Sequence, residues 1–181
     1  MKRTITNPVI KDEVTFVKTA EETNGEVTEL RIVLQPGGKN DLHYHTSYSE
    51  TFTALDGKLG VMLSGKEKKI LEPGESVFVE KGKPHAFFNS GDSEITFKVE
   101  LKPGHTGFEN SLRIMYGLGN DGLLNEKSMP KNIHHLSVIA RISDMRSANP
   151  FLNLFTPLFL FLGKRAEKNG LQKELMDKYC V

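Results

Sequence analysis

The feature that most constrains the fold is a series of short, alternating segments between residues 14 and 101, each followed by a turn signal. "VTELRIVLQ" (27–35) alternates apolar and polar residues, as does "ETFTALDG" (50–57). Alternation of this period is typical of strands with one buried face, and glycine and proline mark the turns between them. Asp56-Gly57 is a typical hairpin signal, so we expect the segments on its two sides to pair. Many short strands at this spacing predict a sandwich or a small barrel.

The pattern changes to a helical one from residue 105. Thr106 precedes Glu109 by three residues, which predicts a capping box at the start of a helix. Pro130 predicts the start of a second helix, because proline is favoured in the first helical turn. Apolar residues at helical spacing support three helices: Phe108, Leu112, Met115 and Tyr116; Ile133, Leu136, Ile139 or Ala140, and Met145; Leu171, Leu175 and Tyr179. The sequence therefore predicts a mainly β chain, with a β domain (a sandwich or a small barrel) over 1–104 (core 27–101) and a helical C-terminal extension over 105–181.

The most apolar stretch is "PFLNLFTPLFLFL", residues 150–162. It is too short to cross a bilayer, which needs about 20 apolar residues. A helix that is apolar nearly all round is usually buried on most sides. Three alternatives follow: the segment packs within the chain, it joins a second copy of the chain, or it touches a membrane surface peripherally. We expect a homodimer.

Composition excludes several classes of partner. The chain of 181 residues has 24 Lys and Arg against 23 Asp and Glu, so it has no electrostatic case for nucleic acid. Cys180 is the single cysteine, which excludes an intramolecular disulfide and is consistent with a reducing cytoplasm. The first residues, "MKRTITNPVIKDEV", lack the apolar region of a signal peptide. We expect a cytoplasmic protein without integral membrane association.

The stretch "HYHTSYSE" carries the residues that indicate chemistry. His43 and His45 are two residues apart, so in a strand they project to the same side. Glu50 starts the next segment, and it would face the same cavity if the two strands pair antiparallel. His85 follows a Gly/Pro turn and is the best candidate for a third imidazole. Three imidazoles and one carboxylate suit divalent Fe, Mn, Ni, Cu or Zn, and they do not suit calcium, which prefers six to eight oxygens.

Two motifs in this region resemble those of the cupin superfamily. "GGKNDLHYHTSYSETFTALDG" is similar to the first cupin motif, G-x5-H-x-H-x4-E-x6-G, in which the matching residues are Gly37, His43, His45, Glu50 and Gly57. "GESVFVEKGKPHAFFN" is similar to the second motif, G-x5-P-x-G-x2-H-x3-N, in which the matching residues are Gly74, Gly82, His85 and Asn89. Glu80 stands where the family usually has proline, a departure that affects a turn and not a ligand. The resemblance covers residues 30–101, or 14–101 with the flanking strands.

The resemblance implies a jelly-roll β-barrel with one divalent metal (Fe, Mn, Ni or Zn) at its open end. The implied ligands are His43, His45, Glu50 and His85. It does not imply one reaction, because cupins include dioxygenases, isomerases, decarboxylases and non-enzymatic binding proteins. Our first hypothesis is a dioxygenase-like, metal-dependent enzyme that acts on a small organic molecule. The alternative is a non-catalytic cupin that binds or senses a small ligand.

Three aromatic residues are further candidates for the site. Tyr48 lies in the turn beside the predicted ligands and could donate a proton, although an exposed turn tyrosine is the favoured interpretation. Phe52 has the same strand parity as Glu50, and Phe87 has the same parity as His85. Both phenylalanines could line a substrate pocket. Ordinary packing in the barrel core explains them equally well.

Overall fold

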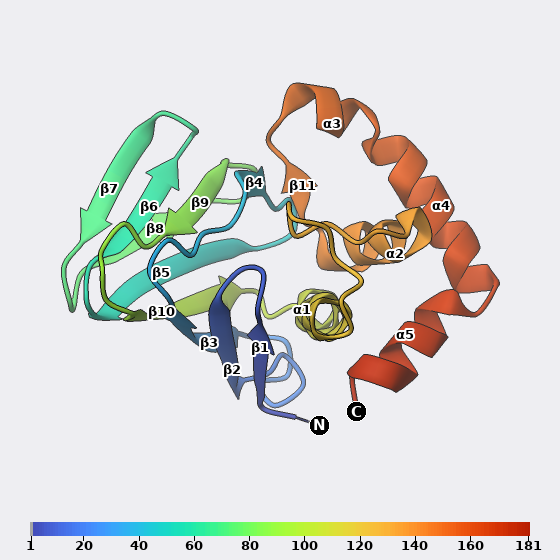
Figure 1. The fold of residues 1–181 in the computed structure, drawn as a ribbon, viewed down its shortest axis with the longest axis horizontal. Helices are drawn as coiled ribbons and strands as arrows, with labels where there is room; N and C mark the ends of the chain where they lie inside the picture. The colour runs from blue at the N-terminus through green and yellow to red at the C-terminus, as the bar shows by residue number, and fades with distance from the viewer. Residues whose placement is uncertain (1) are drawn as a thin grey trace.

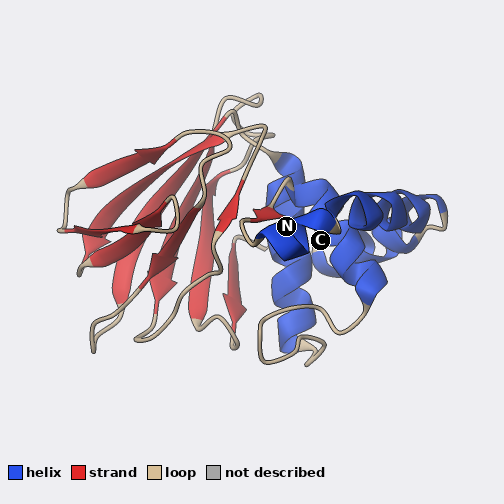
Figure 2. Cartoon of the chain, turned by 90° about the horizontal axis from the view of Figure 1, so that it is seen from above, coloured by secondary structure: helices blue, strands red, loops and turns tan. Residues whose placement is uncertain are grey.

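In residues 2–181, two antiparallel β-sheets face each other, and five helices gather at one end of them (Figures 1 and 2). The computed structural model describes residues 2–181. The six-stranded sheet has the order β1 (Thr4–Asn7), β2 (Asp12–Lys18), β3 (Thr28–Leu34), β10 (Ile95–Lys102), β5 (Ser49–Asp56), β8 (Ser76–Val79). The five-stranded sheet has the order β11 (Arg146–Ser147), β4 (His43–Tyr44), β9 (His85–Phe88), β6 (Leu59–Leu63), β7 (Glu67–Leu71). The predicted mainly β, jelly-roll fold with a helical extension is confirmed.

The core lies between the two sheets and follows from the alternation in the sequence. In β3, Leu30, Ile32 and Leu34 are buried, while Arg31 between them is exposed. The partner strand β10 buries Phe97, which has no exposed surface. Burial of each such side chain contributes roughly 1.5–3 kcal/mol to stability. The two inner faces therefore hold the sheets together.

The hairpin predicted at Asp56-Gly57 is wrong. β5 ends at Asp56 and belongs to the six-stranded sheet, whereas β6 begins at Leu59 in the other sheet. The turn carries the chain from one sheet to the other. A local turn signal does not specify whether the two strands that flank it pair with each other. Gly57 adopts a positive φ of 72°, and a Cβ there would lie 2.6 Å from Cγ2 of Ile95. Glycine is therefore required at this crossing.

The helices are α1 (Thr106–Asn120), α2 (Ile133–Ser143), α3 (Pro150–Leu154), α4 (Thr156–Lys168) and α5 (Leu171–Tyr179). Phe108 and Tyr116 of α1 enter the core of the barrel. On its other side α1 contributes Ile114 and Leu118 to a second core. That core also contains residues of α2, α4 and α5: Val138, Ile139, Ala166 and Leu175. Helix α1 therefore joins the barrel to the other helices.

The predicted starts of α1 and α2 are wrong, the first by one residue and the second by three. His105, not Thr106, caps α1, because its side chain accepts a hydrogen bond from the Phe108 amide. The Glu109 carboxylate accepts instead from the Ala20 amide at 2.6 Å and from the Thr28 hydroxyl at 2.5 Å. A capping box would leave these buried donors without an acceptor. Helix α2 begins at Ile133 after an Asn132 cap and not at Pro130, which forms a β-bridge with Leu124.

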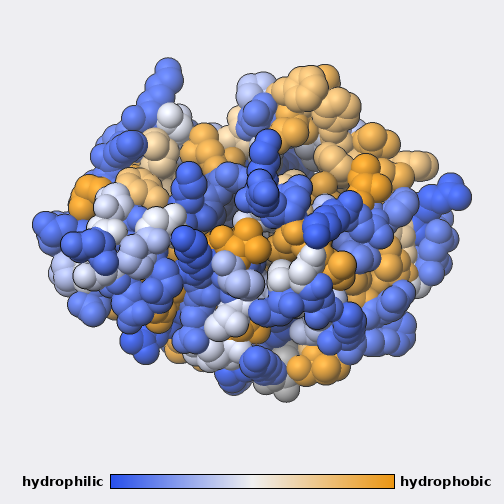
Figure 3. All heavy atoms as spheres, viewed as in Figure 1, coloured by the Kyte–Doolittle hydropathy of each residue, from blue (hydrophilic) through white to orange (hydrophobic). Residues whose placement is uncertain are grey.

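The apolar segment 150–162 forms α3 and the first half of α4, and most of it is not covered by the rest of the chain. Phe151 is 68% exposed, Leu154 72% and Phe161 63%. We define the α3–α4 surface as the exposed apolar residues Phe151, Leu152, Leu154, Phe155, Leu158, Leu160 and Phe161. It appears as an orange area over these helices at the upper right (Figure 3). The alternative that this segment packs within the chain is therefore wrong.

Among residues 2–181, no helix combines the length and the hydropathy that a membrane span requires.

Candidate metal centre

The four predicted ligands come from both sheets. His43 in β4 lies directly opposite His85 in β9, and His45 follows the end of β4. Glu50 is the second residue of β5, in the facing sheet, where it lies between Val79 and Leu101 of the neighbouring strands. The two strands around "TSYS" therefore do not pair with each other, and the antiparallel pairing considered above is not what brings Glu50 to the histidines. The turn carries the chain across the barrel, and Glu50 approaches the imidazoles from the opposite sheet.

The four side chains converge on one point. Their potential ligand atoms all lie within 4.8 Å of one another, and all four residues are buried. The Glu50 Oε2 atom is 3.4 Å from His45 Nε2 and 2.5 Å from His85 Nε2. The ring centroids of His43 and His85 are 4.5 Å apart. The arrangement places three imidazoles around one carboxylate oxygen.

Hydrogen bonds on the outer side of two rings fix their orientation. His43 Nδ1 is 2.7 Å from the Asp41 carbonyl, and His85 Nδ1 is 2.9 Å from the Lys83 carbonyl. A carbonyl oxygen can only accept, so both Nδ1 atoms carry a proton. In the neutral ring, Nε2 then holds the lone pair. This is how metal-binding histidines are usually held, with the outer nitrogen donating to a carbonyl or carboxylate.

The donor atoms at the centre fit a metal ion. His45 Nε2, His85 Nε2 and Glu50 Oε2 are buried, and none of them has a hydrogen-bond partner among residues 2–181. Although His85 Nε2 and Glu50 Oε2 are close, they are not aligned for a hydrogen bond. Buried polar atoms are normally hydrogen-bonded, so three convergent atoms without partners need another explanation. Imidazole and carboxylate donors in this number suit a divalent transition metal.

Burial and charge keep His43 and Glu50 in the forms that metal binding requires. Burial, with the neighbouring His85 and His45, lowers the pKa of His43 to about 3, so this ring is neutral. Burial alone would raise the pKa of Glu50, but His45 and His85 outweigh it and hold that pKa well below its usual range. Burial lowers the pKa of His85, and the Glu50 carboxylate more than offsets this, so its net shift is upward. Glu50 is therefore a carboxylate.

Tyr48 is not exposed, so the favoured interpretation of this residue was wrong. It is 1% exposed, and its hydroxyl oxygen lies 2.6 Å from His45 Nδ1. Its ring stacks on His45, with centroids 4.3 Å apart. Burial and the charges of Glu50 and Asp144 raise its pKa well above the usual value. Tyr48 is therefore a neutral phenol behind His45, on the side that faces away from Glu50.

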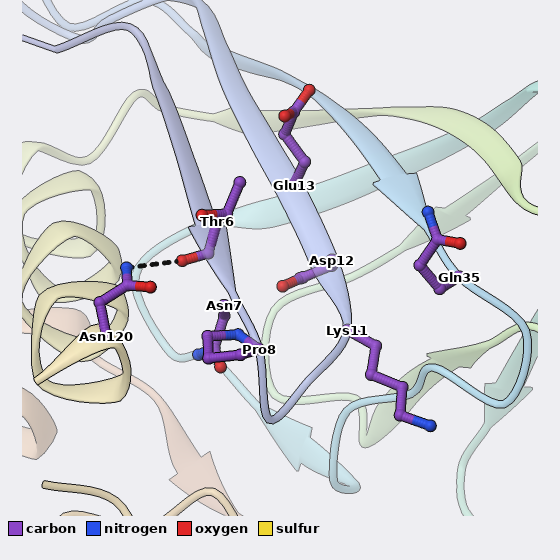
Figure 4. Close-up of a pocket in the computed structure, with 8 residues that line it drawn as sticks. All are labelled: Thr6, Asn7, Pro8, Lys11, Asp12, Glu13, Gln35 and Asn120. Carbon is purple, nitrogen blue, oxygen red and sulfur yellow. Dashed lines mark hydrogen bonds between the residues drawn. The ribbon is translucent and has the colours of Figure 1, made fainter. Parts of the chain in front are cut away.

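Phe52 and Phe87 both lie in the barrel core beside the four residues. The Phe52 ring centroid is 5.7 Å from that of His85 and 6.4 Å from that of Phe87. Two surface hollows are also present. One of about 310 Å³ is at the turn between β1 and β2 (Figure 4), and one of about 350 Å³ is lined by residues that include Met62, Phe87 and Phe88. Neither hollow is lined by the candidate ligands.

Sequence reasoning missed the residues that the helical extension brings to the site. The carboxylate of Asp144 accepts hydrogen bonds from the Thr46 and Ser47 amides, each at 2.7 Å. The Ser143 carbonyl accepts from the Tyr48 hydroxyl at 3.0 Å. These residues are more than 90 positions from the turn they contact, and no local pattern marks them.

Residues 30–107 match the family model Cupin_2, described as a cupin domain. This part of the chain is a cupin domain. An uncharacterized protein of Aquifex aeolicus (strain VF5) is 29% identical to this chain over an alignment of 114 residues, which covers 58% of this chain and 92% of that protein.

Two solved structures are also similar to this cupin. One is an RmlC-like cupin from Shewanella frigidimarina NCIMB 400, with 19% identity over 57% of this chain and 86% of that one, and a TM-score of 0.49. The other is a predicted oxalate decarboxylase from Thermotoga maritima, with 22% identity over 51% of this chain and 80% of that one, and a TM-score of 0.48.

Proposed function

We propose that this cupin binds one divalent transition metal (Fe, Mn, Ni or Zn) through His43, His45, Glu50 and His85. We further propose that it acts as a metal-dependent enzyme on a small organic molecule. One observation carries the proposal: three buried donor atoms converge, and within the described part of the chain none has a hydrogen-bond partner. The neutral His43 ring and the ionised Glu50 are the forms that a metal requires.

Dioxygenase-like chemistry is the first reaction class to test. A bound metal with coordination positions left for other ligands supplies Lewis-acid or oxygen-activating chemistry. The chain contributes the fixed imidazoles, and the outer hydrogen bonds of His43 and His85 orient them. Phe52 and Phe87 supply apolar surface that would exclude water and contact the carbon skeleton of a substrate.

The alternative function is a non-catalytic cupin that binds or senses a small ligand. The same four buried residues support it, because a metal held by them could bind a small ligand without turning it over. Oxygen consumption with a panel of catechols, flavonols, diketones and thiols separates the two functions. Turnover of any member at full rate without oxygen would exclude the dioxygenase.

Metal binding itself is tested by elemental analysis of protein purified without a chelating or imidazole step. We expect close to one metal ion per chain in the wild type and loss of most of it in His45→Ala. His134→Ala is the matched control, because His134 is an exposed histidine of α2. Stoichiometric metal in His45→Ala would contradict the proposed site. Equal loss in both variants would show that the effect is not specific to the cluster.

We also propose that the α3–α4 surface binds a second copy of the chain. Segment 150–162 contains no charged residue, and obligate homodimer interfaces are the more apolar ones. With roughly 200 Å² for each fully exposed Phe or Leu, its seven side chains expose about 700 Å² of apolar surface. This is close to the ~800 Å² per partner of a standard interface and larger than the usual patch on a monomer.

Light scattering during size-exclusion chromatography tests the dimer. The chain mass is 20.3 kDa, and we expect the wild type to elute at about twice this mass. Phe161→Glu should yield a monomer, whereas Phe78→Glu, a matched change at an exposed phenylalanine of β8, should not. A monomeric wild type would refute this interface, and binding of that monomer to lipid vesicles would assign the surface to membranes.

The free, buried Cys180 is consistent with the cytoplasmic location that we propose.

A further inference from the structure

Residues 143–147, at the end of α2 and just beyond it, belong to the helical extension, yet they contact the part of the barrel that holds the proposed ligands. The Ser143 carbonyl and the Asp144 carboxylate contact the turn of residues 46–48, which lies between His45 and β5. Strand β11 pairs with β4, the strand that carries His43. These three contacts restrain the His45 imidazole, the backbone of the turn and the strand before it.

The first contact determines which nitrogen of His45 carries the proton. The Tyr48 hydroxyl oxygen lies 2.6 Å from His45 Nδ1 and 3.0 Å from the Ser143 carbonyl oxygen. A phenol has one proton, and the carbonyl can only accept it. With that proton directed at Ser143, the phenol oxygen accepts from His45 Nδ1–H. The lone pair of His45 is then on Nε2, the atom 3.4 Å from Glu50 Oε2.

The second contact fixes the backbone of the turn. The Asp144 carboxylate accepts from the amides of Thr46 and Ser47 and from both of their hydroxyls. Asp144 adopts the left-handed conformation, with φ at 54°, as the residue that ends α2. Its hydrogen bonds lower its pKa against the opposing effect of burial. Hydrogen bonds from backbone N–H groups to a carboxylate are among the stronger hydrogen bonds in proteins.

The third contact adds a strand to the sheet beside the proposed ligands. In β11, Arg146 lies opposite Tyr44 and Ser147 lies opposite His43. The Ala148 amide continues the pairing by donating to the Leu42 carbonyl. Without β11, strand β4 would be the edge of the five-stranded sheet. The extension therefore covers the strand from which His43 projects.

We propose that Tyr48 and Asp144 are positioning residues, which hold His45 with its Nε2 lone pair directed at the metal position. This inference rests on the proposed metal site. Tyr48 acts through His45 and has no contact of its own with the point where the donor atoms converge. Loss of such an outer partner typically weakens metal binding 10–100-fold.

The first test needs no metal. Two-bond nitrogen–proton NMR correlations on the full-length, metal-free protein, recorded at mildly alkaline pH with ¹⁵N-labelled histidine, report the tautomer of each ring. In the wild type we expect His45 to carry its proton on Nδ1, like His43 and His85. In Tyr48→Phe we expect His45 to become a mixture of both tautomers. Tyr44→Phe is the matched control, because its hydroxyl contacts Asn153 and not a ligand ring.

The second test measures affinity with Mn(II) and Co(II) by titration calorimetry. Tyr48→Phe should weaken binding 10–100-fold, and Tyr44→Phe should leave it within about threefold. Asp144→Asn should weaken binding by about tenfold, because an amide offers the turn one acceptor oxygen in place of two. Its matched control is Asp121→Asn. In the wild type the Asp121 carboxylate also accepts hydrogen bonds, from Lys178 and Tyr179, but it does not contact the turn.

These results test two separate proposals, the metal site and the positioning role of Tyr48 and Asp144. A wild-type His45 with its proton on Nε2 overturns the positioning role, even if a variant fails to fold. Unchanged tautomers and affinity in Tyr48→Phe overturn it as well. If the wild type binds no metal but the His45 tautomer shifts in Tyr48→Phe, the metal site fails and the positioning role is supported.

Discussion

Asp12 is a buried carboxyl group that we expect to destabilise the fold when it is charged. It lies at the start of β2, where it is 7% exposed. One carboxylate oxygen accepts from the Tyr116 hydroxyl at 2.5 Å, and the other is buried and finds no hydrogen-bond partner in the described residues. The residue opposite it in β1 is Asn7, which carries no charge (Figure 4). Burial therefore outweighs the Tyr116 hydrogen bond and raises the pKa of Asp12 to about 6.

The magnitude follows from the difference between the folded and unfolded pKa values. The folded pKa is about 6 and the ordinary value is 3.8, which corresponds to about 3 kcal/mol of free energy. Below pH ~4, Asp12 is protonated in both states and costs nothing. As the pH rises from about 4 to 6, only the unfolded state loses its proton, so the free energy of unfolding decreases. Above about pH 6 the full penalty remains.

The perturbation is Asp12→Asn, which keeps an oxygen for the Tyr116 hydroxyl and removes the charge. Urea denaturation at about pH 7 should show the variant to be more stable by ~3 kcal/mol, or by about 6–12 °C in Tm. At about pH 4 the two proteins should have equal stability. Glu13→Gln is the matched control, because Glu13 is exposed on the opposite face of the same strand. We expect its effect to be within about 0.5 kcal/mol at either pH.

The result that would refute this reasoning is a stability difference between Asp12→Asn and wild type that does not change between the two pH values. A less stable variant at neutral pH would also refute it. In that case the carboxylate would have to gain more from its contacts than it loses by burial.

Three further predictions concern the helical side and the metal. Glu109→Ala should lower stability by about 1–3 kcal/mol, because it leaves the Ala20 amide unsatisfied, and Glu109→Gln should restore part of this by supplying one oxygen. A chelator should lower the Tm of metal-loaded protein by about 5–10 °C, since ligand at 100 times its Kd adds about 2.7 kcal/mol; an unchanged Tm would argue against a bound metal. A chain of residues 1–104 keeps all four proposed ligands but loses Phe108, Tyr116 and the Asp144 contacts; by circular dichroism and calorimetry we expect no cooperative unfolding and no metal binding.

The sheets and the four converging residues could be predicted because their signals are local. Alternation along strands such as 28–34 identifies the buried face directly. The spacing of His43, His45 and Glu50 lies within one strand–turn–strand unit, and His85 begins another strand of the same kind. The pairing of strands was not local, so the hairpin at Asp56-Gly57 was predicted incorrectly. A turn residue reports that the chain reverses, and it does not report which sheet the next strand joins.

The surroundings of the site could not be predicted because they depend on contacts between distant residues. Tyr48 looks like an exposed turn residue in the sequence, since the carbonyl that its hydroxyl binds is 95 residues away. Asp144 follows a helix without any motif that links it to Thr46. The exposure of segment 150–162 could not be predicted from the local sequence either. It depends on how much of α4 its neighbours, chiefly α2 and also α5, can cover.

The three histidines show why the extension matters for the site. His43 and His85 each use the carbonyl two residues earlier, Asp41 and Lys83, to hold Nδ1. His45 cannot use the same device, because the residue two positions earlier is His43, which lies inside β4 between two paired strands. The backbone groups of such a residue are engaged in the sheet. His45 therefore needs Tyr48, and Tyr48 needs the Ser143 carbonyl to take its proton. By this argument the barrel orients two of its imidazoles by itself, and it orients the third only when the helical extension is in place.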